Sequence, residues 1–279
     1  MITGKLESFI ANLGGNYSIV LRDLNKGQDL YLLNPEKLIK AASTVKIPIM
    51  MEIMAKVSDG KLDLEMDIQI DNEPKVAFSK INHLKTDKLK LRELLIYMMS
   101  ISDNTATNIL IELAGMDSIN NRMKSLGIEK TILKRKMMDF ASAAKGLENY
   151  TGAIEIAKLL EMIYSGSFIS KEICGKMVDY MSTGIDKDFM DRYLPKELKV
   201  AHKTGELDHM DHDCGIVYLK DYVKNYMKGT DAFDKIEKGE LGDYILVMLG
   251  EGFENNIVGR EKISKLSEFV FNQSLNGWS

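Results

Sequence analysis

Apolar residues recur at helical spacing near the beginning of the chain and through its middle. Six stretches share this pattern, and they cover residues 6–13, 91–99, 105–113, 118–126, 152–163 and 171–181. Side chains three and four positions apart lie on one face of a helix, so each stretch predicts a helix with one buried face. The first helix is expected to end at Gly14, and the middle of the chain is predicted to be helical.

Alternating apolar and polar residues predict strands on both sides of this helical middle. Five stretches show the alternation, and they cover residues 17–23, 29–33, 200–204, 215–219 and 244–249. The first two are separated by a turn at Asn25-Lys26-Gly27, and the last is followed by a helix over about residues 258–272. Strands at both ends of the chain with helices between them imply one sheet built from the two termini.

The stretch over residues 42–54 is apolar on nearly every side and predicts a buried helix. Its first turn carries Ser43 and Lys46, which at this spacing share one helix face. Burial would lower the pKa of Lys46 by desolvation, and a neutral amine beside a hydroxyl can take its proton and make Ser43 a nucleophile. The alternative for an isolated pair is that Ser43 caps the helix and Lys46 extends to solvent. The rest of the chain has to decide between the two.

The composition indicates a folded protein without an extreme charge. The 279 residues are 45% apolar, and the net charge is −4 with acids and bases interspersed, so no basic face favours nucleic acid. No apolar run approaches the roughly 18 residues that a membrane span needs. The N-terminus lacks the apolar core of a secretory signal, so a cytoplasmic location is expected, with a removed signal as the competing explanation. Cys174 and Cys214 are expected to be free thiols.

Two further motifs favour the catalytic interpretation of Ser43 and Lys46. Ser102-Asp103-Asn104 lies between two predicted helices, and Lys203-Thr204-Gly205 ends a predicted strand. Each triplet alone is weak, because such triplets occur by chance in turns and at strand ends. Together and in this order, the three motifs form the set of class A β-lactamases and penicillin-binding proteins, and the chain resembles that family over nearly its whole length.

The resemblance implies a fold of the α/β (α+β) class, a three-layer sandwich. An antiparallel sheet flanked by helices would form an α/β lobe from residues 1–36 and 184–279. An all-helical lobe, residues 37–183, would be inserted into it, with the active site in the cleft between the lobes. The resemblance also implies a monomer without cofactor or metal whose partner is a small β-lactam, peptide or ester, and neither nucleic acid nor membrane.

The resemblance assigns roles to the residues of the first two motifs. Ser43 would attack a β-lactam or peptide carbonyl, Lys46 would help to deprotonate it, and Ser102 would relay a proton to the departing nitrogen. Asn104 would orient the acyl side chain. These roles describe a serine hydrolase that acts through an acyl-enzyme.

The third motif would bind the substrate. Lys203 and Thr204 would hold the substrate carboxylate, with Gly205 beside them. The backbone amides of Ser43 and Glu206 would form the oxyanion hole, and removing such a donor typically costs about 3–4 kcal/mol in transition-state stabilisation.

The sequence departs from the family in the loop after the second motif. Class A enzymes place a glutamate and an asparagine there, in the pattern E-x-x-L-N, and the glutamate activates the water that frees the acylated serine. When Arg135 is aligned with the arginine that usually precedes this glutamate, Met137 falls at the base position and Ala141 at the asparagine. The residues for acylation are all present, so that step is predicted to be complete. Since methionine cannot accept a proton, the deacylation of β-lactams is predicted to be slow or differently organised.

Two carboxylates in the same loop are candidates for a replacement base. Asp139 is the nearest, although its side chain is shorter than that of glutamate, and Glu148 is the other. The alternative for Asp139 is a salt bridge with Arg135 or Lys136 that stabilises the loop.

The missing base keeps other functions open. A penicillin-binding D,D-peptidase or an esterase is the main alternative, and a β-lactam sensor that stays acylated is a third. A metallohydrolase would draw its ligands from the cluster His202, His209, His212, Asp213 and Cys214. His202 precedes Lys203 on one strand, however, and so should point to the opposite face.

Residues 220–243 are a second departure from the family, which usually has a tight hairpin there. With Tyr222, Tyr226 and Phe233 among charged residues, this segment is expected to be a helical flap, an oligomer contact or a solvated excursion.

Overall fold

The computed structural model describes residues 2–70, 74–185 and 187–278. The chain divides into two compact units. We call them the sheet unit, Met1–Lys37, Gly152–Glu161 and Lys187–Ser279, and the helical unit, Leu38–Thr151 and Met162–Asp186. The sequence division into 1–36 and 184–279 against 37–183 differs from this one mainly at 152–161. That segment groups with the sheet unit, where Glu161 forms an ion pair of 2.6 Å with Arg22.

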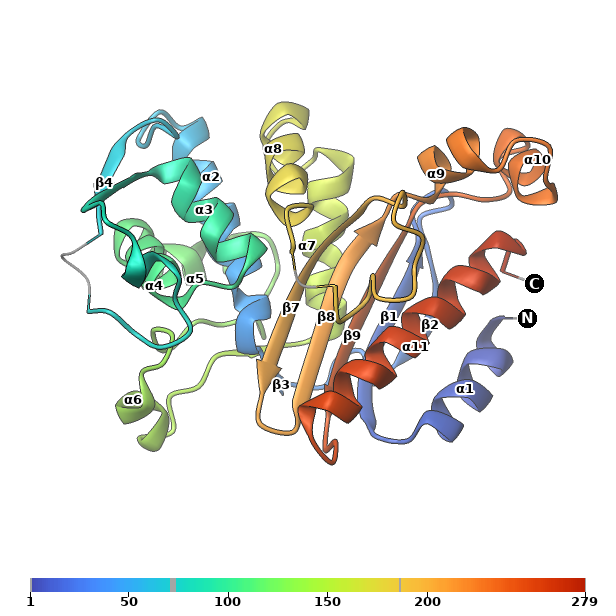
Figure 1. Cartoon of the computed structure of the whole chain (residues 1–279), viewed down its shortest axis with the longest axis horizontal. Helices are drawn as coiled ribbons and strands as arrows, with labels where there is room; N and C mark the ends of the chain where they lie inside the picture. The colour runs from blue at the N-terminus through green and yellow to red at the C-terminus, as the bar shows by residue number, and fades with distance from the viewer. Residues whose placement is uncertain (1, 71–73, 186, 279) are drawn as a thin grey trace. The chain divides into compact units, whose positions relative to one another are not determined.

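The sheet unit contains one five-stranded antiparallel sheet (Figure 1). Its strands are β1 (Asn16–Asp23), β2 (Gln28–Leu33), β7 (Val200–Leu207), β8 (Met210–Val217) and β9 (Tyr244–Glu251). Their order in the sheet is β2-β1-β9-β8-β7, so the first strands of the chain pair with the last. The prediction of an antiparallel sheet built from both termini is confirmed.

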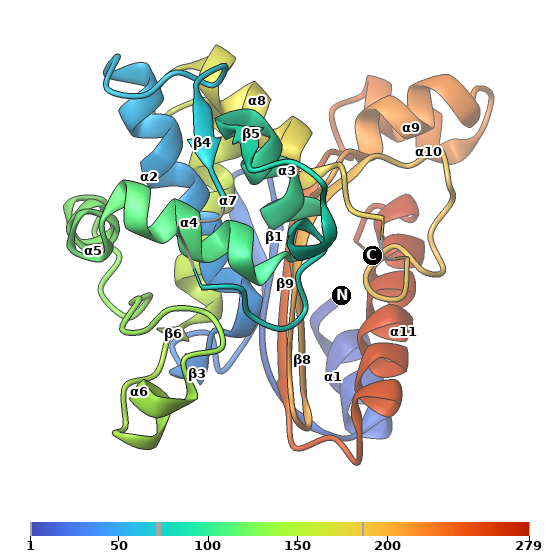
Figure 2. The same cartoon turned by 60° about the vertical axis from the view of Figure 1, so that its left-hand side comes forward.

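Two helices from opposite ends of the chain lie side by side against this sheet, α1 (Ile2–Leu13) and α11 (Asn256–Leu275), as Figures 1 and 2 show. The rings of Phe9 and Phe269 stack with centroids 4.2 Å apart and join the two helices. The inner faces of α1 and α11 are apolar and pack into the main core of the sheet unit, as the amphipathic patterns predict.

The segment after β8 forms two short helices, α9 (Leu219–Tyr226) and α10 (Asp231–Glu237). Leu219, Val223 and Ile236 belong to the core of the sheet unit, and the ring of Tyr222 lies edge-on to that of Phe271, with centroids 6.0 Å apart. The interpretation of this segment as a solvated excursion is therefore wrong, because its apolar residues are buried against the unit rather than hydrated. The helical part of the prediction is confirmed.

The helical unit is built around α2 (Lys46–Ser58), most of whose residues are buried. The helices that pack against it are α3 (Leu91–Ser100), α4 (Asn104–Ala114), α5 (Met116–Ser125) and α8 (Lys171–Met181). The unit also contains two short antiparallel strand pairs: β3 (Ile39–Lys40) with β6 (Tyr150–Thr151), and β4 (Asp67–Gln69) with β5 (Lys88–Lys90). A further helix, α7 (Ala153–Ser165), begins in the sheet unit and ends in the helical unit.

Two predicted elements differ from those in the structure. The strand expected over residues 215–219 is β8 at Met210–Val217 and so begins earlier. Its first half contains Asp211 and Asp213, which accept hydrogen bonds from Asn256 and the backbone of Met190 inside the fold. The loop expected over residues 134–150 contains a short helix, α6 (Phe140–Ala144). When buried polar residues form their hydrogen bonds inside the protein, a strand lacks the alternation of apolar and polar residues by which it is recognised in the sequence.

The described residues also bear on the cysteines and on the membrane. Cys174 and Cys214 are both buried free thiols, as predicted. Among the residues that the structure describes, no helix has the length and apolar character of a membrane span.

Candidate active site

Ser43 lies just before the central helix of the helical unit. It belongs to a short 3₁₀ helix (Ala42–Val45), and α2 begins at Lys46. Ala42, the residue before the serine, has φ of 47°, a left-handed conformation that is costly for a residue with a Cβ. The helix caps are Ala41 and Val45, so the interpretation of Ser43 as an N-cap is wrong, and its hydroxyl remains for another role.

Lys46 is fully buried, with no exposed surface. Its ammonium nitrogen donates to the backbone oxygen of Ser102 at 2.7 Å, to Ser102 Oγ at 2.9 Å and to Asn104 Oδ1 at 3.0 Å. The alternative of a surface lysine that extends to solvent is therefore wrong. A buried amine in contact with a hydroxyl is the arrangement expected of a group that moves protons.

The loop between α3 and α4 holds Ser102 and Asn104 in place through Asp103. Asp103 is fully buried, and its carboxylate accepts the backbone N–H of Ala106, which caps α4. The same carboxylate accepts the backbone N–H groups of Lys80 and Ile81 at 2.5 and 3.1 Å. Ser102 itself has φ of 58°. Asp103 thus fixes the strained turn that presents its two neighbours to Lys46.

Phe78 is a candidate binding residue that sequence reasoning missed. Its backbone oxygen accepts the N–H of Asn104 at 3.4 Å, and the Asn104 side chain donates to the carbonyl of Ala77 at 3.1 Å. The Phe78 ring is 81% exposed on a backbone with φ of 57°. An exposed aromatic ring held beside Asn104 is suited to stack on a bound molecule. In the sequence, a single phenylalanine in a polar loop gives no such signal.

Met137 occupies a fixed position in the loop that follows. Its backbone N–H donates to Asn108 Oδ1 at 2.8 Å, and its backbone oxygen accepts from Asn108 Nδ2 at 3.1 Å. Asn108 lies one turn after Asn104 on α4, so the helix that carries Asn104 also fixes this part of the loop. The Met137 side chain is buried and carries no proton acceptor.

Asp139 has a structural role in the same loop. Its carboxylate accepts the backbone N–H of Ser142 at 2.9 Å and the hydroxyl of Ser142 at 2.6 Å, so it caps α6. These two hydrogen bonds from Ser142 lower the pKa of the Asp139 carboxyl. Arg135 pairs instead with Glu148, and Lys136 pairs with Glu112. The predicted salt bridge of Asp139 is therefore wrong, and its stabilising role is helix capping. A lowered pKa makes this carboxylate a weaker base.

Glu148, the other candidate base, is paired with Arg135. Arg135 Nη2 lies 2.7 Å from Glu148 Oε1, and both side chains are largely buried. Asn149 also joins the two ends of the loop, because its side-chain oxygen accepts the backbone N–H groups of Lys134 and Arg135. The ion pair holds the two ends of the loop together, so the role of Glu148 is to stabilise the loop.

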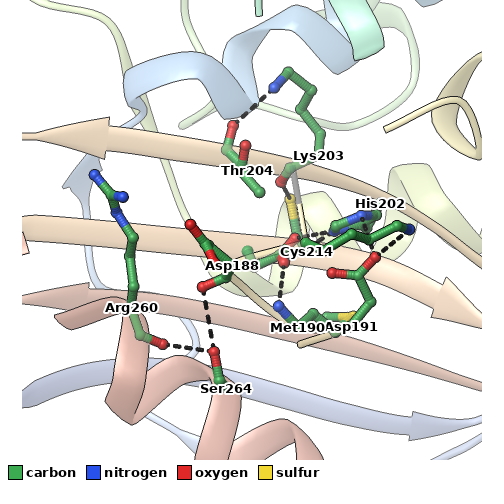
Figure 3. Close-up of polar contacts among 11 residues, drawn as sticks. Asp188, Met190, Asp191, His202, Lys203, Thr204, Cys214, Arg260 and Ser264 are labelled. Atoms are coloured by element: carbon green, nitrogen blue, oxygen red, sulfur yellow. Dashed lines mark hydrogen bonds and ion pairs between the residues drawn. The ribbon is translucent and has the colours of Figure 1, made fainter. Parts of the chain in front are cut away.

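The third motif lies on β7 of the sheet unit. Lys203 is 2% exposed, and its ammonium nitrogen donates to the backbone oxygen of Thr204 at 3.1 Å (Figure 3). Gly205 pairs with His212 of β8. The carboxylate of Glu206 lies 2.7 Å from Arg260 Nη2 of α11, which anchors the strand end that follows the motif. The edge of the sheet unit therefore presents a cation and a hydroxyl on an ordered strand.

The histidines are engaged in contacts with the protein. His202 Nδ1 lies 2.9 Å from Asp213 Oδ2, His209 Nδ1 lies 2.9 Å from the backbone oxygen of Phe253, and His212 Nδ1 accepts the N–H of Gly250. Among residues 2–70, 74–185 and 187–278, no group of three or more histidine, cysteine, aspartate or glutamate side chains is arranged to hold a metal ion. The cluster considered from the sequence is thus spread over separate contacts.

The predicted site residues therefore form two groups. The helical unit brings Ser102 and Asn104 to Lys46, three residues after Ser43, and the sheet unit carries the third motif, which is Lys203, Thr204, Gly205 and Glu206. Within the helical unit, a buried amine in contact with a hydroxyl is suited to proton transfer. Within the sheet unit, the third motif places a lysine and a threonine on one ordered strand.

The sequence is similar to those of known beta-lactamases. VEB-1 beta-lactamase from Pseudomonas aeruginosa is 23% identical over 99% of this chain and 91% of its own. PER-1, an extended-spectrum beta-lactamase from the same species, is 29% identical over 68% of this chain and 66% of its own, so the aligned part spans just under two thirds of that relative.

Solved structures share the fold. A beta-lactamase from Sphaerobacter thermophilus superposes with a TM-score of 0.80 at 24% identity and covers 97% of both chains. The structure of PBP-A superposes with a TM-score of 0.78 at 22% identity, over 97% of this chain and 94% of its own. Residues 2–236 match the family model Beta-lactamase2, described as the beta-lactamase enzyme family. The chain belongs to the beta-lactamase enzyme family.

Proposed function

We propose that this protein is a serine hydrolase that opens the amide bond of β-lactams through an acyl-enzyme on Ser43. The observation that carries this proposal is the buried side-chain nitrogen of Lys46, 2.9 Å from Ser102 Oγ and three residues after Ser43. Family membership supports the reaction type, and the names of the beta-lactamase relatives support the substrate class.

In the proposed acylation, Lys46 in its neutral form takes the proton of Ser43 while the serine oxygen attacks the carbonyl. The proton then passes from Lys46 to Ser102 along their hydrogen bond, and Ser102 protonates the departing nitrogen. Asn104, fixed by Lys46 and by the carbonyl of Ala77, orients the acyl side chain. Lys203 and Thr204 hold the substrate carboxylate, and the amides of Ser43 and Glu206 stabilise the oxyanion.

We propose further that deacylation is slow. The backbone of Met137 is held by Asn108, at the place that the family resemblance gives to the general base, and its side chain accepts no proton. Asp139 and Glu148 are engaged with Ser142 and Arg135. Positioned general bases contribute about 10²–10⁴-fold to rate, so a comparable lengthening of the acyl-enzyme lifetime is expected.

The methionine at the position of the general base, Met137, favours a second candidate function, a D,D-peptidase or esterase acting on small peptides or esters. Such an enzyme needs the same acylation step, and long-lived acylation by β-lactams is compatible with it. Among the similar structures is a mutant of PBP-A as an acyl-enzyme complex with penicillin G. A cytoplasmic location, an expectation from the sequence, would favour a soluble peptide or ester over cell-wall material, and we propose a monomer, which light scattering after gel filtration would check.

The test of the nucleophile is labelling with a fluorescent penicillin. The wild-type protein should become covalently labelled, and Ser43→Ala should not, because the substitution removes the oxygen that we propose to attack the carbonyl. Ser142→Ala is a matched control, since it removes a serine hydroxyl that bonds only to Asp139 in the loop, and it should retain labelling. Labelling of Ser43→Ala, or none of the wild type, would overturn the proposal.

A further inference from the structure

A buried acidic cluster surrounds His202 on the face of β7 opposite Lys203 (Figure 3). His202 is 5% exposed, and its Nδ1 lies 3.0 and 2.9 Å from the two carboxylate oxygens of Asp213, which is fully buried. Its other ring nitrogen, Nε2, lies 3.8 Å from Asp191 Oδ2. One imidazole therefore stands between two carboxylates.

The cluster joins four parts of the sheet unit. Asp213 on β8 accepts the backbone N–H of Met190 at 2.9 Å, and Lys187 lies 2.5 Å from Asp191, so the segment over residues 187–191 is tied to the sheet. Ser264 of α11 donates to the backbone oxygen of Asp188 at 3.3 Å and so ties the segment to that helix. Removing the imidazole would remove the side-chain link from β7 to Asp213 and Asp191, while the β7–β8 ladder would remain.

The backbone beside His202 leaves room for nothing larger than glycine. Gly215 is the partner of His202 across the β7–β8 ladder, and a Cβ at Gly215 would lie 2.6 Å from the Cβ of His202 and 2.9 Å from the carbonyl of Ala201. The two strands approach closely at this pair, so a displacement of His202 would be transmitted directly to β8.

The charges around His202 favour its protonated form. They come from every element packed against it: Asp213 from β8, Lys187, Asp188 and Asp191 from the adjoining segment, Arg260 from α11, and Lys203 from β7 itself. Arg260 is occupied by Glu206, and burial raises the pKa of the neighbouring Cys214 thiol, which stays neutral. Desolvation lowers the pKa of His202, but the charges of Asp213 and Asp191 and the hydrogen bond to Asp213 outweigh it, so that the pKa is raised.

We propose that His202 is a positioning residue that, as an imidazolium ion between Asp213 and Asp191, fixes β7 so that Lys203 and Thr204 bind the carboxylate of the substrate. The proposal rests on the function proposed above. Lys203 directly follows His202 in the strand, and its carbonyl accepts the Cys214 thiol at 3.3 Å, so the backbone of Lys203 is held by the same ladder. His202 touches no substrate and acts through Lys203.

The pH dependence follows from the sign of the shift. A group whose pKa is raised on folding contributes stability that is fully present below its unfolded pKa of about 6.5 and is lost as the pH rises through the folded value. Above that value Asp213 loses its cationic partner while Asp191 keeps Lys187, so the side-chain link between β7 and the two carboxylates weakens and β7 loosens. Binding of an anionic substrate should therefore weaken on the alkaline side, while the chemical step at saturation should not change.

The first test is an NMR titration of the histidine side chains in the free protein, which needs no activity. The sequence has four histidines, and the His202 signal is assigned as the one missing from His202→Gln. The expected result is an imidazole that stays protonated above a pH of about 6.5, the ordinary midpoint of a histidine side chain. A His202 ring that loses its proton at or below that pH would overturn the proposal.

The second test measures acylation by a chromogenic cephalosporin as a function of its concentration, at several pH values. His202→Gln keeps a donor toward Asp213 without the charge, and it should raise the apparent dissociation constant about tenfold near neutral pH, with the limiting acylation rate unchanged. His209→Gln is the matched control and should match the wild type. Equal loss in both parameters, or no change in the dissociation constant, would contradict a positioning role.

A purely structural role and a failure of the proposed function give different results. If His202→Gln fails to fold, Asp213→Asn serves instead, because it removes one charge of the same cluster at constant shape. It should lower the pKa of His202 in the NMR titration and weaken cephalosporin binding. If the wild type is not acylated at all, the proposed function fails, while the titration still decides the charge of His202.

Discussion

Two asparagines on one helix show what the helical unit retains and what it lacks. Asn104, at the first turn of α4, meets the ammonium group of Lys46, whereas Asn108, one turn later, meets only the backbone of Met137. The first contact belongs to the groups that we propose for acylation. The second holds in position a loop in which Met137 offers no proton acceptor. The comparison teaches that one helix can fix this loop without a base at the position of Met137.

Lys46→Met tests the acylating side of this comparison and should have the largest effect. The change removes the buried amine and leaves Ser102 Oγ and Asn104 Oδ1 without their donor. Acylation by benzylpenicillin should slow by about 10²–10⁴-fold, the range of a positioned general base. Stopped-flow labelling measures the rate, and circular dichroism shows whether the variant is folded. Acylation at the wild-type rate in a folded variant would mean that another group takes the proton of Ser43.

Met137→Glu tests the deacylating side of the comparison. Because Asn108 fixes the backbone at this position, a carboxylate placed there should shorten the lifetime of the penicilloyl adduct, by about tenfold or more if it acquires part of a general base's contribution. Met137→Gln is the matched control, with the same shape but no basic oxygen. Equal lifetimes for the two variants would show that the water, as well as the base, is missing.

Arg135→Gln sharpens the view that the loop is held by an ion pair of its own. Removing one partner leaves Glu148 largely buried and uncompensated, and hydrogen bonds to charged groups contribute about 1.5–3 kcal/mol, so the free energy of unfolding should fall by roughly that amount. Urea denaturation measures the change. A stability equal to that of the wild type would show that the pair is replaced by water. Arg192→Gln, at a more exposed ion pair with Glu261, should cost less.

Asp139→Asn should have the smallest effect. The lowered pKa of Asp139 means that its contribution to stability is present at neutral pH and is lost as the pH falls through the folded value, which lies below the ordinary value of about 3.9. The variant should therefore differ slightly from the wild type at neutral pH and merge with it in acid. Its adduct lifetime at pH 7 should match that of the wild type, and a marked lengthening would identify Asp139 as the base after all.

The sequence predicts the groups that act through local spacing and misses those that depend on distant contacts. Ser43 and Lys46 share one stretch, and the residues on either side of Asp103 follow from a turn between two periodic helices, so these were predictable. The contact of Phe78 with Asn104 joins segments far apart in the chain, and periodicity carries no information about it. The polar residues of β8 were missed for the same reason, since Asp213 is buried only because His202 and Met190 meet it.

The most direct measurement of the central claim is intact-mass spectrometry of the wild-type protein mixed with benzylpenicillin, followed over time beside a hydrolysis assay. We expect rapid addition of one penicillin mass, located on Ser43 by peptide mapping, and an adduct that persists for many minutes with little product in solution. Rapid product formation with no lasting adduct would contradict the account, because it would require a functional base that neither Met137 nor its neighbours provide.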